Sequence, residues 1–218
     1  MECNSLKMLL RAWWMRRTHP SQKRVLICGD SNSSLPNLHE CWPGILTRMT
    51  KGKIHFVNDS VDGRTSGFDK KELNACLYLK RRLGKYEPLD HVFIMVGTND
   101  VKMRYGPPSS NEIALNFKTI VELIFGHREN IQPAFLLPPP IGKGLGDDFY
   151  RADERIRQVC TVIRNFCAER KLPVIDTHSV LSVSSHLEAD SVHLNASGRQ
   201  VVANAVHSYL FGSSCAVP

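Results

Sequence analysis

The sequence lacks an apolar run of the roughly 18 residues that a helix needs to span a bilayer, so we expect no transmembrane segment. It also lacks a C-x-x-C pair, a G-x-G-x-x-G loop and a P-loop, which argues against dithiol, dinucleotide and nucleotide-phosphate sites. The seven cysteines are an odd number without paired spacing. They favour buried free thiols in a reducing compartment over a disulfide framework, and we expect a cytoplasmic protein.

The charge is basic, with 28 lysines and arginines against 21 aspartates and glutamates, a net charge of +7. Such an excess is compatible with a nucleic acid or an anionic surface as partner. The basic residues are scattered, however, and the group Lys80-Arg81-Arg82 falls on the expected solvent face of a helix. Basic and aromatic residues are not interleaved. We therefore expect no nucleic-acid partner.

The first 22 residues form a basic and apolar extension that contains Trp13 and Trp14. Arg11 interrupts its apolar part and no small-residue cleavage site follows, so it does not resemble a secretory signal. An organelle-targeting or membrane-surface helix remains open. We favour a leader helix that docks on the domain or on a neighbouring subunit. The length of 218 residues then predicts a single domain over residues 23–218.

Short apolar runs alternate with helical patterns along this domain. Near-continuous apolar runs predict buried strands at residues 25–28, 54–57, 91–96, 134–137 and 174–176. Capping boxes at 69–72 and 109–112 each predict a helix start, and the first helix is expected to bury Leu73, Cys76, Leu77 and Leu83. The helical period is clearest over 152–167, and Asn195 or Ser197 opens a last helix. This alternation predicts an α/β fold, a five-stranded parallel sheet with helices on both faces.

Polar residues follow the predicted strands where a ligand is expected, at their carboxyl ends. Ser31 follows the first strand, Gly63 the second and Asn99 the third, and a Pro-rich loop at 138–146 follows the fourth. Near the C-terminus, Asp190 and His193 lie three residues apart. A serine that attacks an acyl carbon needs a base, the base needs an orienting carboxylate, and the oxyanion needs donors.

Each of these residues alone has an ordinary explanation as a turn or a helix cap. Their joint occurrence, in order along the chain and at one edge of the sheet, favours acyl-transfer chemistry. Ser31, Asp190 and His193 are the predicted catalytic residues. The Ser31 and Gly63 backbone N–H groups and the Asn99 amide are the predicted oxyanion hole.

Four sequence blocks resemble those of the SGNH (GDSL-type) hydrolase superfamily: Gly29-Asp30-Ser31-Asn32, the block at Gly63, Gly97-Thr98-Asn99-Asp100 and Asp190-x-x-His193. More narrowly, residues 42–46, 63–65, 88–100, 137–141 and 190–194 resemble the short arylesterase/acyltransferase (perhydrolase-like) branch. The similarity extends over about residues 24–211. It implies a three-layer flavodoxin-like fold, ester hydrolysis through an acyl-enzyme, no metal or cofactor, and a homo-oligomer.

Two departures from that branch lie beside the nucleophile. Asn32 stands where the branch usually has Leu, and Ser33-Ser34-Leu35 replaces Thr-Trp-Gly. We expect Asn32, Phe68, Met103, Pro139 and Ile141 to line a compact site for a small acyl group, with ordinary loop packing as the alternative for each. The expected partner is a small-molecule ester, whose alcohol could be a sugar, an aryl alcohol or an alkyl alcohol.

Two other classes of function compete with an esterase. One is a non-catalytic basic binding protein on an SGNH-like scaffold, suggested by the charge and the extension. The other is a phosphate-binding flavodoxin-like domain, since the Gly29–Asn32 turn could hold a phosphate. The absence of a glycine-rich phosphate motif argues against the second.

Overall fold

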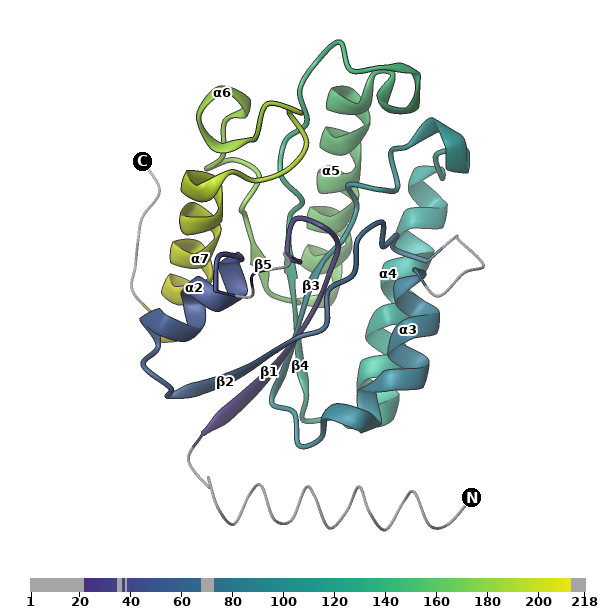
Figure 1. The fold of residues 1–218 in the computed structure, drawn as a ribbon. Helices are drawn as coiled ribbons and strands as arrows, with labels where there is room; N and C mark the ends of the chain where they lie inside the picture. Colours follow the sequence, from purple (N-terminus) through teal and green to yellow (C-terminus); the bar gives the residue numbers. More distant parts are fainter. Residues whose placement is uncertain (1–21, 35–36, 38, 68–72, 213–218) are drawn as a thin grey trace.

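A five-stranded parallel sheet forms the centre of the molecule. The structure, a computed structural model, describes residues 22–34, 37, 39–67 and 73–212. The strand order is β2-β1-β3-β4-β5, and every neighbouring pair is parallel (Figure 1). The strands are β1 (Lys23–Gly29), β2 (Ile54–Asn58), β3 (His91–Met95), β4 (Gln132–Leu136) and β5 (Val174–Ile175). The predicted α/β fold with its five parallel strands is confirmed, and no strand end shifts by more than two residues.

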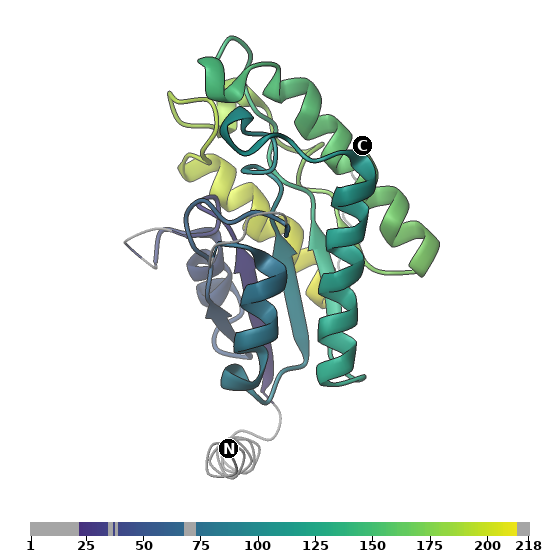
Figure 2. The same cartoon turned by 90° about the vertical axis from the view of Figure 1, so that its right-hand side faces the viewer.

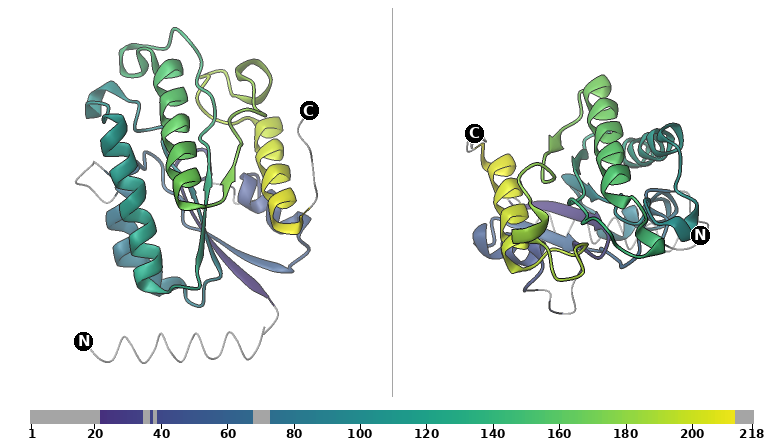
Figure 3. Two further views of the ribbon diagram at one scale, coloured as in Figure 1. Left: turned by 180° about the vertical axis from the view of Figure 1, so that it is seen from behind. Right: turned by 90° about the horizontal axis from the view of Figure 1, so that it is seen from above.

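Helices cover both faces of this sheet. They are α2 (Trp42–Met49), α3 (Ala75–Arg82), α4 (Ser110–His127), α5 (Ala152–Arg170), α6 (Val183–His186) and α7 (Ala196–Phe211). Single 3₁₀ turns lie at Leu83–Tyr86, Met103–Tyr105 and Asp147–Phe149. Helices α3, α4 and α5 lie on one face, while α2 and α7 lie on the other (Figure 2). The view from above shows the two groups on opposite sides of the strands (Figure 3).

The alternation of side chains along the strands explains the two cores. In β1, Leu26 and Cys28 point into the core beneath α3, α4 and α5. Val25 and Ile27 point the other way, into the core beneath α2 and α7. Successive side chains of a strand point to opposite faces, so a sheet that is covered on both faces needs apolar residues at every position. This is the reason why the strands are readable in the sequence as continuous apolar runs.

The start of α3 differs from the expectation. Asp69 and Glu72, the predicted capping box, lie outside the described residues. The helix begins at Ala75, where the Asn74 side chain accepts a hydrogen bond from the Leu77 N–H. Residues 65 and 74 pair as a short bridge immediately before this start, with the Asn74 backbone extended. The helix consequently buries Ala75, Tyr78 and Leu79, with Leu83 just beyond it, whereas Leu73, Cys76 and Leu77 are only half-buried.

The predicted starts of α4, α5 and α7 agree with the structure, whereas α2 and α6 were not predicted from the sequence. Ser109 and Glu112 form the reciprocal capping box of α4. Asn195, one of the two residues considered, caps α7 by accepting the Gly198 N–H. The five cysteines in the described ranges have free thiols. Within those ranges, no helix combines the length and the apolar character needed to cross a bilayer. The extension up to residue 21 falls outside them, so its predicted helix is not addressed.

Candidate active site

Ser31 lies in a tight turn directly after β1. The turn is closed by hydrogen bonds from the Ser33 and Ser34 N–H groups to the Asp30 carbonyl, at 3.0 and 3.1 Å. The Trp42 indole donates to Ser33 Oγ at 3.0 Å. A Cβ on Gly29 would lie 2.4 Å from Ser33 Oγ and 2.6 Å from its Cβ, so only glycine fits before the turn. The Ser31 hydroxyl is therefore held at the carboxyl end of the sheet.

His193 lies in a compact loop between α6 and α7. The Asp190 Oδ1 accepts hydrogen bonds from the Val192 N–H at 2.9 Å and the His193 N–H at 3.0 Å. The Glu188 N–H donates to the His193 carbonyl at 2.7 Å. Ser191 adopts the left-handed conformation, with φ of 55°, which folds the loop back on itself. The loop thus fixes the backbone on which the imidazole stands.

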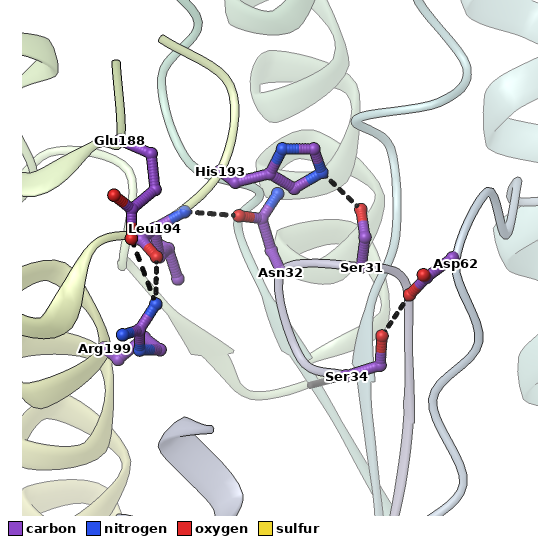
Figure 4. A pocket seen from close by; sticks show the side chains of 8 residues that line it. All are labelled: Ser31, Asn32, Ser34, Asp62, Glu188, His193, Leu194 and Arg199. Atoms are coloured by element: carbon purple, nitrogen blue, oxygen red, sulfur yellow. Dashed lines mark hydrogen bonds and ion pairs between the residues drawn. The ribbon is translucent and has the colours of Figure 1, made fainter. Parts of the chain in front are cut away.

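The structure brings together the three predicted catalytic side chains. His193 Nε2 lies 3.0 Å from Ser31 Oγ, across 162 residues of sequence, and Figure 4 shows the ring directed at the hydroxyl. On its other side, His193 Nδ1 lies 2.5 Å from Asp190 Oδ2. Partial burial acts to raise the pKa of Asp190, but the hydrogen bonds from the His193 ring and the two backbone N–H groups outweigh it and hold this pKa below its usual value. The carboxylate therefore stays ionised beside the imidazole.

The two remaining oxyanion candidates lie beside each other at the same edge of the sheet. Gly63 has a φ of +79°, which a glycine adopts without strain. Asn99 is buried and uses one amide hydrogen to bond the Arg64 carbonyl at 3.1 Å. The buried Arg64 guanidinium in turn donates to the carbonyls of Asp59 at 2.8 Å and Gly29 at 3.3 Å. The Gly63 turn is thereby tied to the end of β1.

A cavity of about 370 Å³ opens at the Ser31 hydroxyl. Its lining includes polar side chains and charges of both signs. On one side, Ser34 donates a hydrogen bond to Asp62. On the other side, Arg199 lies 3.4 Å from the Glu188 carboxylate (Figure 4). The lining residues are Ser31, Asn32, Ser34, Asp62, Glu188, His193, Leu194 and Arg199.

The comparison with known families identifies the family of the chain. The model of the GDSL-like lipase/acylhydrolase family matches residues 27–201, which include every predicted catalytic and oxyanion residue. The chain belongs to the GDSL-like lipase/acylhydrolase family. Membership makes this GDSL-like hydrolase a carboxylic ester hydrolase that acts on small-molecule esters.

Solved structures share its fold. The native aryl esterase of M. smegmatis superimposes with a TM-score of 0.77 at 22% identity, over 87% of this chain and 99% of the other. Est24, a carbohydrate acetylesterase from Sinorhizobium meliloti, superimposes with a TM-score of 0.76 at 22% identity, again over 87% of this chain and 99% of the other. The lipase/acylhydrolase of Enterococcus faecalis superimposes with a TM-score of 0.70 at 20% identity, over 87% of this chain and 96% of the other. None of the curated sequences compared with the chain is a match.

The predicted substrate-binding residues of this GDSL-like hydrolase are only partly at the cavity. Asn32 lines it. Met103, Pro139 and Ile141 are not among the lining residues: Ile141 packs into the core beneath α3, α4 and α5, Pro139 is buried, and Met103 is exposed in its 3₁₀ turn. Phe68 lies outside the described residues.

Sequence reasoning placed Ser34 beside the nucleophile but missed four other residues that line the cavity: Asp62, Glu188, Leu194 and Arg199. Three of them have a signal in their position, since Asp62 precedes Gly63, Leu194 follows His193 and Glu188 lies two residues before Asp190. Arg199 has none, because it reaches the cavity from the first turn of α7. In the described part of the chain, no cluster of three His, Cys, Asp or Glu side chains is arranged to hold a metal ion.

Two buried carboxyl groups lie behind the nucleophile of the GDSL-like hydrolase. Asp30 Oδ1 accepts the Asn32 N–H at 2.9 Å, and its Oδ2 has no partner among the described residues. Burial raises the pKa of Asp30 to about 6, against the lowering effect of that N–H. Burial likewise raises the pKa of Asp100 to about 6, although the Ser66 N–H donates to its carboxylate at 3.0 Å. Both groups face protein rather than the cavity, so their effect is on stability.

Proposed function

We propose that this hydrolase cleaves short-chain esters, acetyl esters above all, through an acyl-enzyme on Ser31. The observation that carries the proposal is the 3.0 Å contact between His193 Nε2 and Ser31 Oγ. That distance lies within the hydrogen-bonding range required of a general base. The cavity that opens at the same hydroxyl gives an ester room to bind.

In the first step, His193 takes the Ser31 proton as the oxygen attacks the ester carbonyl. Asp190 stabilises the imidazolium through its contact with Nδ1. The oxyanion accepts hydrogen bonds from the backbone N–H groups of Ser31 and Gly63 and from the second amide hydrogen of Asn99. Each such donor contributes roughly 10²–10³ in rate. His193 then passes the proton to the leaving alcohol.

In the second step, water attacks the acyl-enzyme and His193 serves as base again. An alcohol in place of water would transfer the acyl group. The cavity is open enough to admit either, and the ratio of hydrolysis to transfer then depends on which nucleophile binds beside His193.

The walls of the cavity favour a hydroxylated alcohol over an aryl alcohol. Asp62 and Glu188 offer acceptors and Arg199 offers donors. Asp62 lies on one side of Ser31, and Glu188 and Arg199 lie on the other (Figure 4). A sugar can bond to both kinds of group, whereas an aromatic ring would desolvate them without compensation. Structural similarity does not separate the two alcohols, because an aryl esterase and a carbohydrate acetylesterase superimpose equally well, so the assignment depends on the lining residues. We therefore infer that the substrate is an O-acetylated carbohydrate or polyol.

The nucleophile is tested by Ser31→Ala. The variant should keep its fold by circular dichroism and lower kcat/KM for nitrophenyl acetate by on the order of 10⁴-fold or more. Ser34→Ala is the matched control, because Ser34 lines the same cavity but bonds to Asp62 rather than to His193; its effect should stay below about 10-fold. His193→Ala should match Ser31→Ala, and the double variant should be no worse than either. A Ser31→Ala enzyme that retains most of its activity would overturn the assignment.

The alcohol is tested separately by comparing acetylated monosaccharides with phenyl acetate. Asp62→Ala and Glu188→Ala, which remove acceptors that line the cavity, should lower kcat/KM for the sugar esters by roughly tenfold per lost hydrogen bond and change phenyl acetate hydrolysis little. Equal effects on the two substrates would contradict the carbohydrate assignment and leave the esterase assignment standing.

A further inference from the structure

Asn32 connects the turn that carries Ser31 to the loop that carries His193. Its side chain is 3% exposed. The carboxamide oxygen accepts a hydrogen bond from the Leu194 N–H at 2.9 Å, across 162 residues of sequence (Figure 4). The carboxamide nitrogen donates a longer bond of 3.5 Å to Thr98 Oγ1, on the loop after β3. One side chain therefore joins three loops that meet at the carboxyl end of the sheet.

The bond to Leu194 is placed where it controls the distance between the reacting groups. It starts one residue after Ser31 and ends one residue after His193. Within the described ranges, segments 30–34 and 186–195 share two hydrogen bonds, namely this one and the Ser31–His193 contact itself. The other bonds at His193 lie within its own loop. Without Asn32, nothing but the catalytic hydrogen bond would tie the two segments at this point.

The chemistry of position 32 makes this connection particular to the chain. The branch that the sequence resembles usually has leucine here, and a leucine side chain offers no acceptor. In this protein a leucine would leave the Leu194 N–H without a partner in a buried place. Asn32 itself is firmly placed, because its own N–H donates to Asp30 Oδ1 at 2.9 Å.

We propose that Asn32 is a positioning residue, whose carboxamide holds the His193 loop so that Nε2 stays within reach of the Ser31 hydroxyl. This inference rests on the proposed function, since it acts through the Ser31–His193 pair. A displacement of about 1 Å between reacting groups costs up to roughly 10²-fold in rate. Loss of the acceptor should therefore slow acylation for every ester by a similar factor. A residue that merely bound substrate would change one ester more than another.

The test compares Asn32→Leu and Asn32→Ala, which lack the acceptor, with Asn32→Asp, which keeps an oxygen in its place. The first two should lower kcat/KM by about 10–100-fold, equally for phenyl acetate and an acetylated sugar. Asn32→Asp should recover most of this loss. Thr98→Val removes the 3.5 Å bond from Asn32 and the contact by which the Thr98 side chain lowers the pKa of the buried Asp30, but it leaves the Asn32–Leu194 bond in place. It is the matched control and should stay within about threefold of wild type.

Two further measurements separate positioning from a general structural effect. In a His193→Ala background, Asn32→Leu should cause no further loss, because it acts through the imidazole. In the wild-type protein, hydrogen exchange followed by NMR should show a protected Leu194 amide. This readout needs no variant and decides the question even if both substitutions prevent folding.

The outcomes are distinguishable from a failure of the proposed function. Wild-type protein that hydrolyses no ester overturns both proposals. An active wild type with an Asn32→Leu variant of equal activity, or with an unprotected Leu194 amide, overturns the positioning role alone. A further decrease in kcat/KM when Asn32→Leu is added to His193→Ala would also overturn the positioning role alone.

Discussion

Replacing Asp30 with asparagine should change how stability depends on pH. The Asp30 carboxyl is fully enclosed behind the nucleophile turn, and burial raises its pKa from 3.8 to about 6. A group that holds its proton more tightly in the folded protein opposes folding as the pH rises, because the unfolded chain ionises first. The cost appears as the pH rises through the interval from about 4 to 6 and is complete above it.

The magnitude follows from the two pKa values. A displacement of about two units corresponds to about 3 kcal/mol at neutral pH and to about 1.6 kcal/mol at pH 5. The Asp30→Asn variant has no carboxyl to ionise at this position, and the asparagine oxygen can still accept the Asn32 N–H. Relative to wild type, the variant should gain about 1.4 kcal/mol of unfolding free energy between pH 5 and pH 7.5. The Asp30 charge also raises the pKa of Asp100, so its removal lowers the pH-dependent cost of Asp100 and adds to the gain of the variant.

The assay is urea unfolding of both proteins at several pH values, taking the difference in unfolding free energy at each. Asp176→Asn is a control of opposite sign. Partial burial acts to raise the pKa of Asp176, but bonds from Arg164 and Ser179 outweigh it and lower this pKa. The unfolding free energy of wild type, relative to that of the Asp176→Asn variant, should therefore increase as the pH rises through the acidic range. If the unfolding free energy of Asp30→Asn relative to wild type stays constant or decreases as the pH rises, the argument from burial is refuted.

Two other substitutions test the site and its support. Gly198→Ala places a Cβ 2.2 Å from the His186 carbonyl oxygen and should destabilise the protein by about 1–3 kcal/mol in thermal unfolding. Gly126→Ala, in α4 with nothing within 4 Å, should stabilise it by about 0.5–1 kcal/mol. A Gly198→Ala variant that is more stable than Gly126→Ala would contradict the packing at α7. Asn99→Ala should lower kcat/KM for nitrophenyl acetate by about 10²–10³-fold, whereas Asn116→Ala, which loses a bond to Ser66 Oγ, should change it less than about threefold. An Asn99→Ala enzyme with wild-type kinetics would remove this residue from the oxyanion hole.

The fold was predictable because its strands are buried on both faces. An apolar run such as β1 leaves little choice of structure, and parallel strands bring their carboxyl ends to one edge. That geometry predicts that Ser31 and Asn99 lie at a common edge, and the structure has them there. The start of α3 was not predictable locally, because it directly follows the pairing of Thr65 with Asn74, a contact between separate segments.

The walls of the cavity were predicted less well than the residues at its base. Ile141 is apolar, as expected of a residue in an acyl site, but it packs into the core. Local sequence does not distinguish between these two apolar environments. Arg199 and Glu188 look like ordinary surface charges, and only the fold of the loop between α6 and α7 brings them beside Ser31. Asn32 was expected to line the site, but its bond to Leu194 depends on a partner 162 residues away.

The most direct test of the account is to identify the residue that a fluorophosphonate modifies. Intact-protein and peptide mass spectrometry should find one adduct per chain, on Ser31, formed much more slowly in His193→Ala. An enzyme that hydrolyses esters while the label goes to another residue, or to none, would contradict the assignment of Ser31 as the activated nucleophile.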